Sequence, residues 1–216
     1  MNDDGVRAKR SPFEVIRIDD TQDPFEGISG DSVPFGSGIA LYQEAVPLGL
    51  KHFGLVHFAR IVYRPGQAAA DAIERYSSWS VHTTKLPEGG NFGFGEVVET
   101  DAKNRTKPIG LRTYVLTGKP IVDHHDIAEA FVSEGDEDIP EISIAMRLTE
   151  RGSQQLELAT AEWIDRRLAI VSHGKVESAP VVRAEIKGGH LQIALGPRSD
   201  AEVARAKQLV QEILDK

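Results

Sequence analysis

The chain has 216 residues, of which 40% are hydrophobic and 27% charged, a balance typical of a folded soluble domain. Its formal charge of −8 disfavours non-specific contact with nucleic acid or anionic membranes, and the absence of cysteine excludes disulfides, thiolate nucleophiles and zinc–thiolate sites. No apolar run approaches the roughly 20 residues of a spanning helix, and the charged N-terminus lacks the apolar stretch of a secretory signal, so neither is predicted.

The beginning of the chain is predicted to mix loops and strands. Residues 1–12 are charged and are expected to be mobile, and residues 19–38, which mix Asp, Gly, Pro and Ser, are typical of a loop. Strands are predicted where β-branched and aromatic residues gather, at residues 13–18, 53–63 and 110–116.

One helix is predicted in this half, at residues 67–79, with Ala69, Ile73 and Tyr76 on one stripe. Residues 86–99 are predicted as a glycine-rich loop that runs into a short strand. No strand feeds directly into a helix there, so the loop does not have the geometry of a phosphate cradle.

The second half gives sharper patterns. Residues 123–131, DHHDIAEAF, are predicted as a short helix capped by Asp123. Residues 141–148, EISIAMRL, alternate and predict a strand, after which Thr149 is expected to cap a helix. Residues 168–171, LAIV, show no alternation and predict a strand that is buried on both faces.

A hairpin is predicted after that strand. His173 and Gly174 suit a tight turn, and the returning strand begins at Lys175. Pro180 cannot donate a ladder hydrogen bond, so this strand is expected either to be an edge or to end there. Ser199 and Glu202 form a capping box for a last helix. The intermixed order predicts an α+β fold, with mixed or antiparallel sheets and packed helices.

Candidate chemistry is sparse. The most metal-like string is DHHD at residues 123–126, but adjacent histidines on a helix point in different directions, and no second ligand cluster lies at a suitable spacing. The other histidines are scattered, and no Ser-His-Asp order accompanies a GxSxG elbow. Composition and spacing alone therefore predict a soluble α+β protein that is not an enzyme and has neither a metal nor another cofactor.

A longer pattern supplies a family. The segments RTYVLTGKPIVDHHDIAEAF, PEISIAMRLTERGSQQLELATAEWIDRRLAIVSHGKVESAPVVRAEIKGGHLQIAL and DAEVARAKQLVQEIL occur in one order over residues 110–214. Together they resemble the first periplasmic domain of SecD, part of the SecDF accessory complex of protein export. The resemblance is densest at Thr149–Gly152, at Arg167–Val171 followed by Gly174–Val176, at Ser178–Val181 and at Gly188–Gly189.

The resemblance implies both a division of the chain and a function. It implies a mobile N-terminus at 1–12, a base-like part at 13–117, a head-like subdomain at 118–198, and a C-terminal helix at 199–216 that returns to the base-like part. It also implies a periplasmic, non-catalytic domain that binds emerging unfolded preprotein or a component of the Sec translocon. The implied contact residues are Val176, Ser178, Ala179, Pro180, Val181 and Val182, beside the turn of His173, Gly174 and Lys175.

Three departures from the family pattern keep alternatives open. The sequence shows no membrane segment, His173 stands where the family has aspartate, and the strand that follows the last helix in SecD is missing. One alternative is a stand-alone soluble relative of the head with a different partner, since a fold does not fix a function. The other, less favoured, is a histidine-dependent metalloenzyme built around His124, His125 and Asp126.

Overall fold

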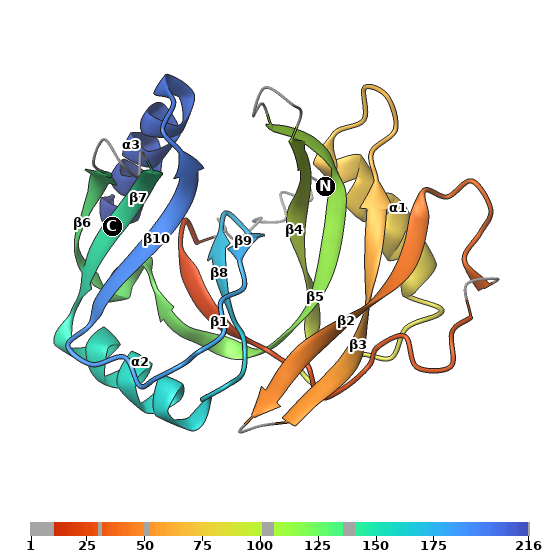
Figure 1. Cartoon of the computed structure of the whole chain (residues 1–216), viewed down its shortest axis with the longest axis horizontal. Coiled ribbons are helices and arrows are strands. Elements are labelled where there is room, and N and C mark those ends of the chain that lie inside the picture. Colours follow the sequence, from red (N-terminus) through yellow and green to blue (C-terminus); the bar gives the residue numbers. More distant parts are fainter. Residues whose placement is uncertain (1–10, 30–31, 50–51, 101–105, 136–140, 216) are drawn as a thin grey trace, which may run out of the picture.

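The described part of the chain forms two β-sheets and three α-helices, whose arrangement is seen in Figure 1. The structure is a computed structural model that describes residues 11–29, 32–49, 52–100, 106–135 and 141–215. The predicted α+β class is confirmed. None of the helices in these ranges is long and apolar enough to cross a membrane.

The larger sheet has seven strands in the order β1-β8-β9-β4-β5-β3-β2. Its strands are β1 (Glu14–Ile18), β2 (Ile39–Gly49), β3 (His52–Val62), β4 (Asn91–Thr100), β5 (Thr106–Asp123), β8 (Leu168–Ser172) and β9 (Lys175–Ser178). Because β1 pairs with both β8 and β5, five strands close into a ring, β1-β8-β9-β4-β5. The ring is filled by small and branched side chains: Ile16, Ile18, Leu116, Ala169, Val171 and Val176.

The ring is narrow, and this explains why the segment predicted as a glycine-rich loop at residues 86–99 contains several glycines. The segment is strand from Asn91 onward, so that prediction is wrong there. A Cβ atom on Gly93 would lie 2.8 Å from Leu116 Cδ1 and 2.9 Å from Val176 Cγ2, so the face of β4 toward the ring has to be bare. The other face carries Phe92 and Phe94, which pack against the buried ring of Tyr76.

Tyr76 lies on α1 (Ala69–Ser80), which covers the outer face of β3, β4 and β5. The expected helix is present, but its buried stripe runs through Ala72, Tyr76 and Ser80, while Ala69 is exposed. Of the three residues in the predicted stripe, Tyr76 and Ile73 pack against this core and Ala69 does not.

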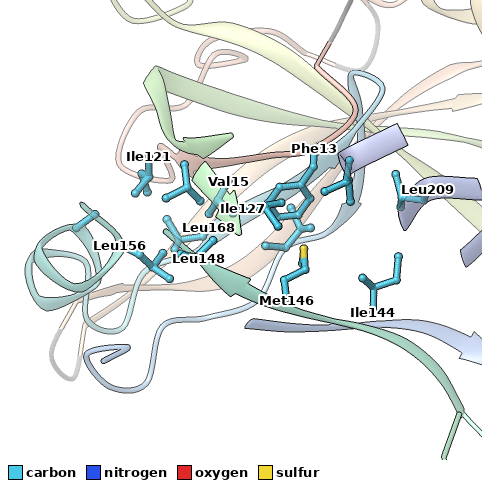
Figure 2. Packing of buried hydrophobic residues seen from close by; sticks show 14 of the residues in the cluster. Phe13, Val15, Ile121, Ile127, Ile144, Met146, Leu148, Leu156, Leu168 and Leu209 are labelled. Atoms are coloured by element: carbon cyan, nitrogen blue, oxygen red, sulfur yellow. The ribbon is translucent and has the colours of Figure 1, made fainter. Parts of the chain in front are cut away.

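The smaller sheet has three strands in the order β10-β7-β6 and is covered on one face by two helices. Its elements are β6 (Ile127–Glu134), β7 (Glu141–Leu148), α2 (Glu150–Glu162), β10 (His190–Pro197) and α3 (Asp200–Leu214). As predicted, β7 points Ile142, Ile144, Met146 and Leu148 inward and Thr149 caps α2. Figure 2 shows that this core also receives Phe13, Val15 and Leu168, so the two sheets share it.

One prediction about this half is corrected by the structure. Residues 123–131 are not a helix: Asp123 caps a single 3-10 turn, η2 (His124–Asp126), and β6 follows at once. The C-terminal helix α3 packs on β6, β7 and β10 and shares a core with Phe13 and Val15. Figure 1 shows α3 beside these strands, whereas β8 and β9 lie with the larger sheet. The proposed boundary at residues 117 and 118 falls inside β5.

Glu14 in β1 is a carboxyl group whose surroundings oppose its charge. Burial raises the pKa of Glu14, and the carboxylate of Asp123, its partner across the β1–β5 ladder, raises it further. The folded state therefore holds this proton more tightly than the unfolded chain does. The protonated Glu14 side chain therefore stabilises the fold at pH values below the pKa of Glu14 in the unfolded chain. This stabilisation is lost as the pH rises through the raised pKa of the folded state.

We therefore expect Glu14→Gln to raise Tm by about 1–2 °C near pH 7 and to have almost no effect below about pH 4. Calorimetry at the two pH values checks this. A matched control is Glu129→Gln, which removes an exposed carboxylate that pairs with Arg147 and is not expected to stabilise the fold. An equal effect of Glu14→Gln at both pH values contradicts the electrostatic explanation.

Candidate functional site

An apolar groove with a volume of about 580 Å³ lies between the two sheets. One wall is strand β10, and the other is the extended segment that follows β9. Its floor comes from β1, α2 and β8. The lining residues are Val15, Leu156, Leu168, Ile170, Ser178, Pro180, Val181, Val182, Arg183, Ala184, Glu185, Ile186, Leu191, Gln192, Ile193 and Ala194. Most of these side chains are apolar, and the two charged ones, Arg183 and Glu185, pair with Asp165 and Lys187, so the groove suits an apolar ligand.

The wall after β9 is held by main-chain hydrogen bonds to the segment before β8. Leu168 N donates to Pro180 O at 3.0 Å, and Val182 N donates to Arg166 O at 2.9 Å. Pro180 supplies only its carbonyl there, so the ladder needs no donor from it. Further along, Ile186 N donates to the Thr160 Oγ1 hydroxyl of α2 at 2.9 Å. The wall is therefore fixed at both ends.

The opposite wall is a sheet edge, because β10 pairs with β7 and with no other strand in the described part of the chain. Leu148 N donates to Gly189 O, which makes these two residues a hydrogen-bonded pair at the start of the ladder. In an antiparallel ladder such pairs alternate, so the main-chain groups of Gln192 and Ala194 point away from β7. Both residues line the groove. A ligand in the groove thus meets unpaired N–H and C=O groups beside an apolar floor.

Charged groups brace the base of the wall. Arg167, which begins the ladder with Val181, is 8% exposed at its side chain, as is Asp20. The Arg167 guanidinium donates two hydrogen bonds to Asp20, at 2.7 and 2.6 Å, and one to Glu44 at 3.1 Å. Burial lowers the pKa of Arg167, but these two carboxylates outweigh it and the net pKa is raised. Burial also disfavours the charged form of Glu44 and so raises its pKa. Arg112 and Arg167 outweigh this effect, and the net pKa of Glu44 is below its ordinary value.

Four of the six residues that the resemblance implied as contacts line the groove: Ser178, Pro180, Val181 and Val182. Val176 does not, because it is 3% exposed and fills the ring, with β8 on one side and β4 on the other. Ala179 packs beside that ring core. Strand β9 ends at Ser178, in line with the expectation drawn from Pro180. The beginning of β9 is not a sheet edge, because it pairs with β4.

The turn residues lie elsewhere. His173 and Gly174 form the predicted tight turn, both with positive φ, at 51° and 78°. His173 Nε2 lies 2.8 Å from Glu212 of α3, and Lys175 Nζ lies 3.1 Å from Glu96 of β4. His173, Lys175 and Glu212 line a separate polar cavity of about 290 Å³, together with Arg205 and Glu177. The turn therefore joins α3 to the larger sheet and does not touch the groove.

The DHHD string has structural contacts that differ from those of a metal site. The rings of His124 and His125 lie side by side, with centroids 3.9 Å apart, against the expectation that they point apart. Asp126 is buried and accepts two hydrogen bonds from Arg151, at 2.6 and 3.0 Å, and a third from Asp123 N. Across the described residues no group of three or more histidine and acidic side chains is arranged to hold a metal ion.

Sequence reasoning missed the larger part of the groove. The wall at Arg183–Ile186 has no periodic pattern, and β10 was not linked to the hairpin. The signal that was available is the string Gly188-Gly189 before β10. Both glycines have positive φ, so the chain turns sharply there and returns beside the segment it has just left.

Comparisons with known proteins agree on one family. The family described as "SecDF, P1 head subdomain" matches residues 96–210, which is more than half of the chain. The Protein translocase subunit SecDF of Thermus thermophilus is 34% identical over 91 residues, which are 42% of this chain and 11% of that protein. The chain thus corresponds to a small part of this relative.

Solved structures of SecDF match most of this chain with low identity and low TM-scores. One, described as a membrane component SecDF that enhances protein export, is 20% identical with a TM-score of 0.40 and covers 93% of this chain and 92% of the other. A second, SecDF in a super-membrane-facing form, is 21% identical with a TM-score of 0.38 and covers 93% of this chain and 28% of the other.

Proposed function

The chain belongs to the SecDF P1 head subdomain family, and from this premise we propose that it acts in protein export as a non-catalytic periplasmic module that binds unfolded preprotein. The groove is the proposed contact site. A component of the Sec translocon is the second partner that the family implies, and the experiment below separates the two.

The observation that carries the proposal is the pairing of an apolar floor with a free strand edge. Unfolded polypeptides share little besides apolar side chains and an unpaired main chain. The main chain of β10 at Gln192 and Ala194 can accept an extended segment whatever its sequence is, because a ladder reads only N–H and C=O groups. The floor at Leu156, Leu168 and Ile193 then favours apolar side chains on that segment.

Site-specific photo-crosslinking tests this proposal. A benzophenone amino acid at Val181 faces the groove, and one at Leu158, which is 69% exposed on α2 and does not line it, is the control. We expect the Val181 probe to capture a reduced, carboxymethylated secretory protein about ten-fold more than the same protein in its folded state. We expect the Leu158 probe to capture neither.

Two results would contradict the proposal. One is equal capture of folded and unfolded protein at Val181, and the other is equal capture at Val181 and Leu158. If the Val181 probe captures purified translocon and not the unfolded protein, the groove serves the second partner. Probes with the same reagent at Ser178, Pro180 and Val182, which also line the groove, can map the bound segment.

A further inference from the structure

Strand β2 is the outer edge of the seven-stranded sheet, on the side of the molecule away from α3. It is 11 residues long and pairs with β3 along its whole length. Its other side has no strand partner in the described part of the chain. An unpaired edge of this length offers a row of main-chain donors and acceptors to another extended chain.

The register of the ladder shows which groups are free. Val62 N donates to Gly38 O, so these residues form a hydrogen-bonded pair, and the next outward-facing positions on β2 are 39, 41, 43 and 45. Two contacts agree with this alternation. Ile39 N turns away from β3 to Ser37 Oγ at 3.2 Å, and Ala59 N, opposite Leu41, turns to Thr113 Oγ1 of β5 at 2.9 Å.

The main-chain groups of Leu41, Gln43 and Ala45 therefore point outward. Natural sheets protect such an edge with charges, prolines or a covering element. The only charge on β2 is Glu44, and its carboxylate turns back to Arg112, at 2.6 Å, and to Arg167. Pro47 also occupies an outward position and has no N–H, so it limits the free edge at one end.

The side chains beside this edge define what fits it. On the face shared by Ala45, the neighbouring β3 residues Leu55 and Phe53 are 66% and 72% exposed. On the opposite face Arg60 stacks over Tyr42 at 6.0 Å, and no ion pair of Arg60 occurs among the described residues. The surface thus carries exposed apolar groups and one uncompensated positive charge. A neutral or acidic extended segment with apolar side chains complements it.

We propose that the β2 edge at Leu41–Ala45 binds an extended apolar segment of another polypeptide as an added strand. A second copy of the chain is a poorer occupant, because it would bring together two molecules of formal charge −8 and two unpaired Arg60 side chains. The proposal rests on the proposed function only in that its ligand is unfolded polypeptide. The site itself is separate from the groove.

The test uses a biotinylated 12-residue peptide of alternating valine and threonine, with a peptide that has proline at every second position as a control. Benzophenone probes are placed at Leu55, beside the edge, and at Val181, in the groove. We expect the Leu55 probe to capture the alternating peptide and not the proline peptide. Gln43→Pro removes an outward N–H while leaving the β3 ladder intact, and should lower that capture about ten-fold. Gln43→Ala keeps the N–H and should not.

A second variant, Ala45→Lys, covers the case in which Gln43→Pro does not fold, because an edge lysine blocks strand addition without removing a ladder group. Capture at Leu55 that neither Gln43→Pro nor Ala45→Lys reduces overturns the proposal. So does a product at Leu55 that consists of two copies of the chain. Capture at Val181 alone overturns this inference and leaves the proposed function standing, and capture at Leu55 alone does the reverse.

Discussion

Arg167→Met is expected to lower the free energy of unfolding by about 3–5 kcal/mol, because it leaves the buried carboxylate of Asp20 without its partner. Methionine keeps the apolar stem, so the loss reports the guanidinium and not packing. For a chain of this size the change corresponds to a fall in Tm of roughly 10 °C. Urea unfolding followed by circular dichroism measures it.

Two controls isolate the cause. Arg166→Met removes the neighbouring guanidinium, which stacks over Trp163 at 4.7 Å and has no buried carboxylate partner, so its cost should be about 1 kcal/mol or less. The double change Arg167→Met with Asp20→Asn removes the uncompensated charge and should recover part of the loss. A loss from Arg166→Met as large as that from Arg167→Met would contradict the argument.

Arg167→Met should also destabilise the wall of the groove that follows β9. Arg167 pairs with Val181, and its neighbours Arg166 and Leu168 hold the wall at Val182 and Pro180. Opening this end of β8 releases the wall before the rest of the molecule unfolds. We therefore expect capture at Val181 to fall in Arg167→Met at temperatures where circular dichroism still reports a folded protein.

Much of the fold followed from periodicity. Strand β7 was predictable because one face meets the core and the other meets solvent, and β8 because both of its faces are buried. Strand β6 was predicted as part of a helix because its alanines and glutamates favour one. Tertiary pairing overrides that preference: Ala130 and Val132 pair with Met146 and Ile144 of β7 and reach the core.

Strand β2 was not predicted at all. Its alternation is weak and it contains Pro47, and both features follow from its place at an edge. Similarly, nothing in the hairpin sequence showed that β4 would pair with β9, which is why Val176 was expected at a surface. Strands β4 and β9 are about 80 residues apart in the sequence, and they pair because the ring closes. The local sequence of either strand does not indicate this pairing.

At the start of α2, the residues that carry the family resemblance have structural contacts. Thr149 caps α2, Arg151 pairs with Asp126, and Gly152 lies against Asp126. The glycine pair reaches the same place, because Gly189 O accepts from Leu148 N just before the cap. The start of α2 is therefore a junction of three segments. Its tight packing accounts for the residue types found there, and none of these residues lines the groove.

Gly152→Ala tests that explanation, because helix propensity and packing predict opposite signs. Propensity alone favours alanine inside a helix by about 1 kcal/mol. At this position the new Cβ would lie 2.8 Å from Asp126 Cβ and 3.0 Å from Asp126 O, so η2 and α2 would have to separate. We expect a net loss of about 2 kcal/mol in the free energy of unfolding. Chemical denaturation measures the sign directly.

The matched control is Gln155→Ala, an exposed position in the same helix, where the change should stay within about 0.5 kcal/mol. A gain in stability from Gly152→Ala would contradict the packing argument and leave the presence of glycine at this position unexplained. A loss would show that the family pattern at residues 149–152 records the joining of α2 to the turn before β6. Residues 149–152 would then have a structural role, and the groove would remain the part of the head-like region whose side chains can contact a ligand.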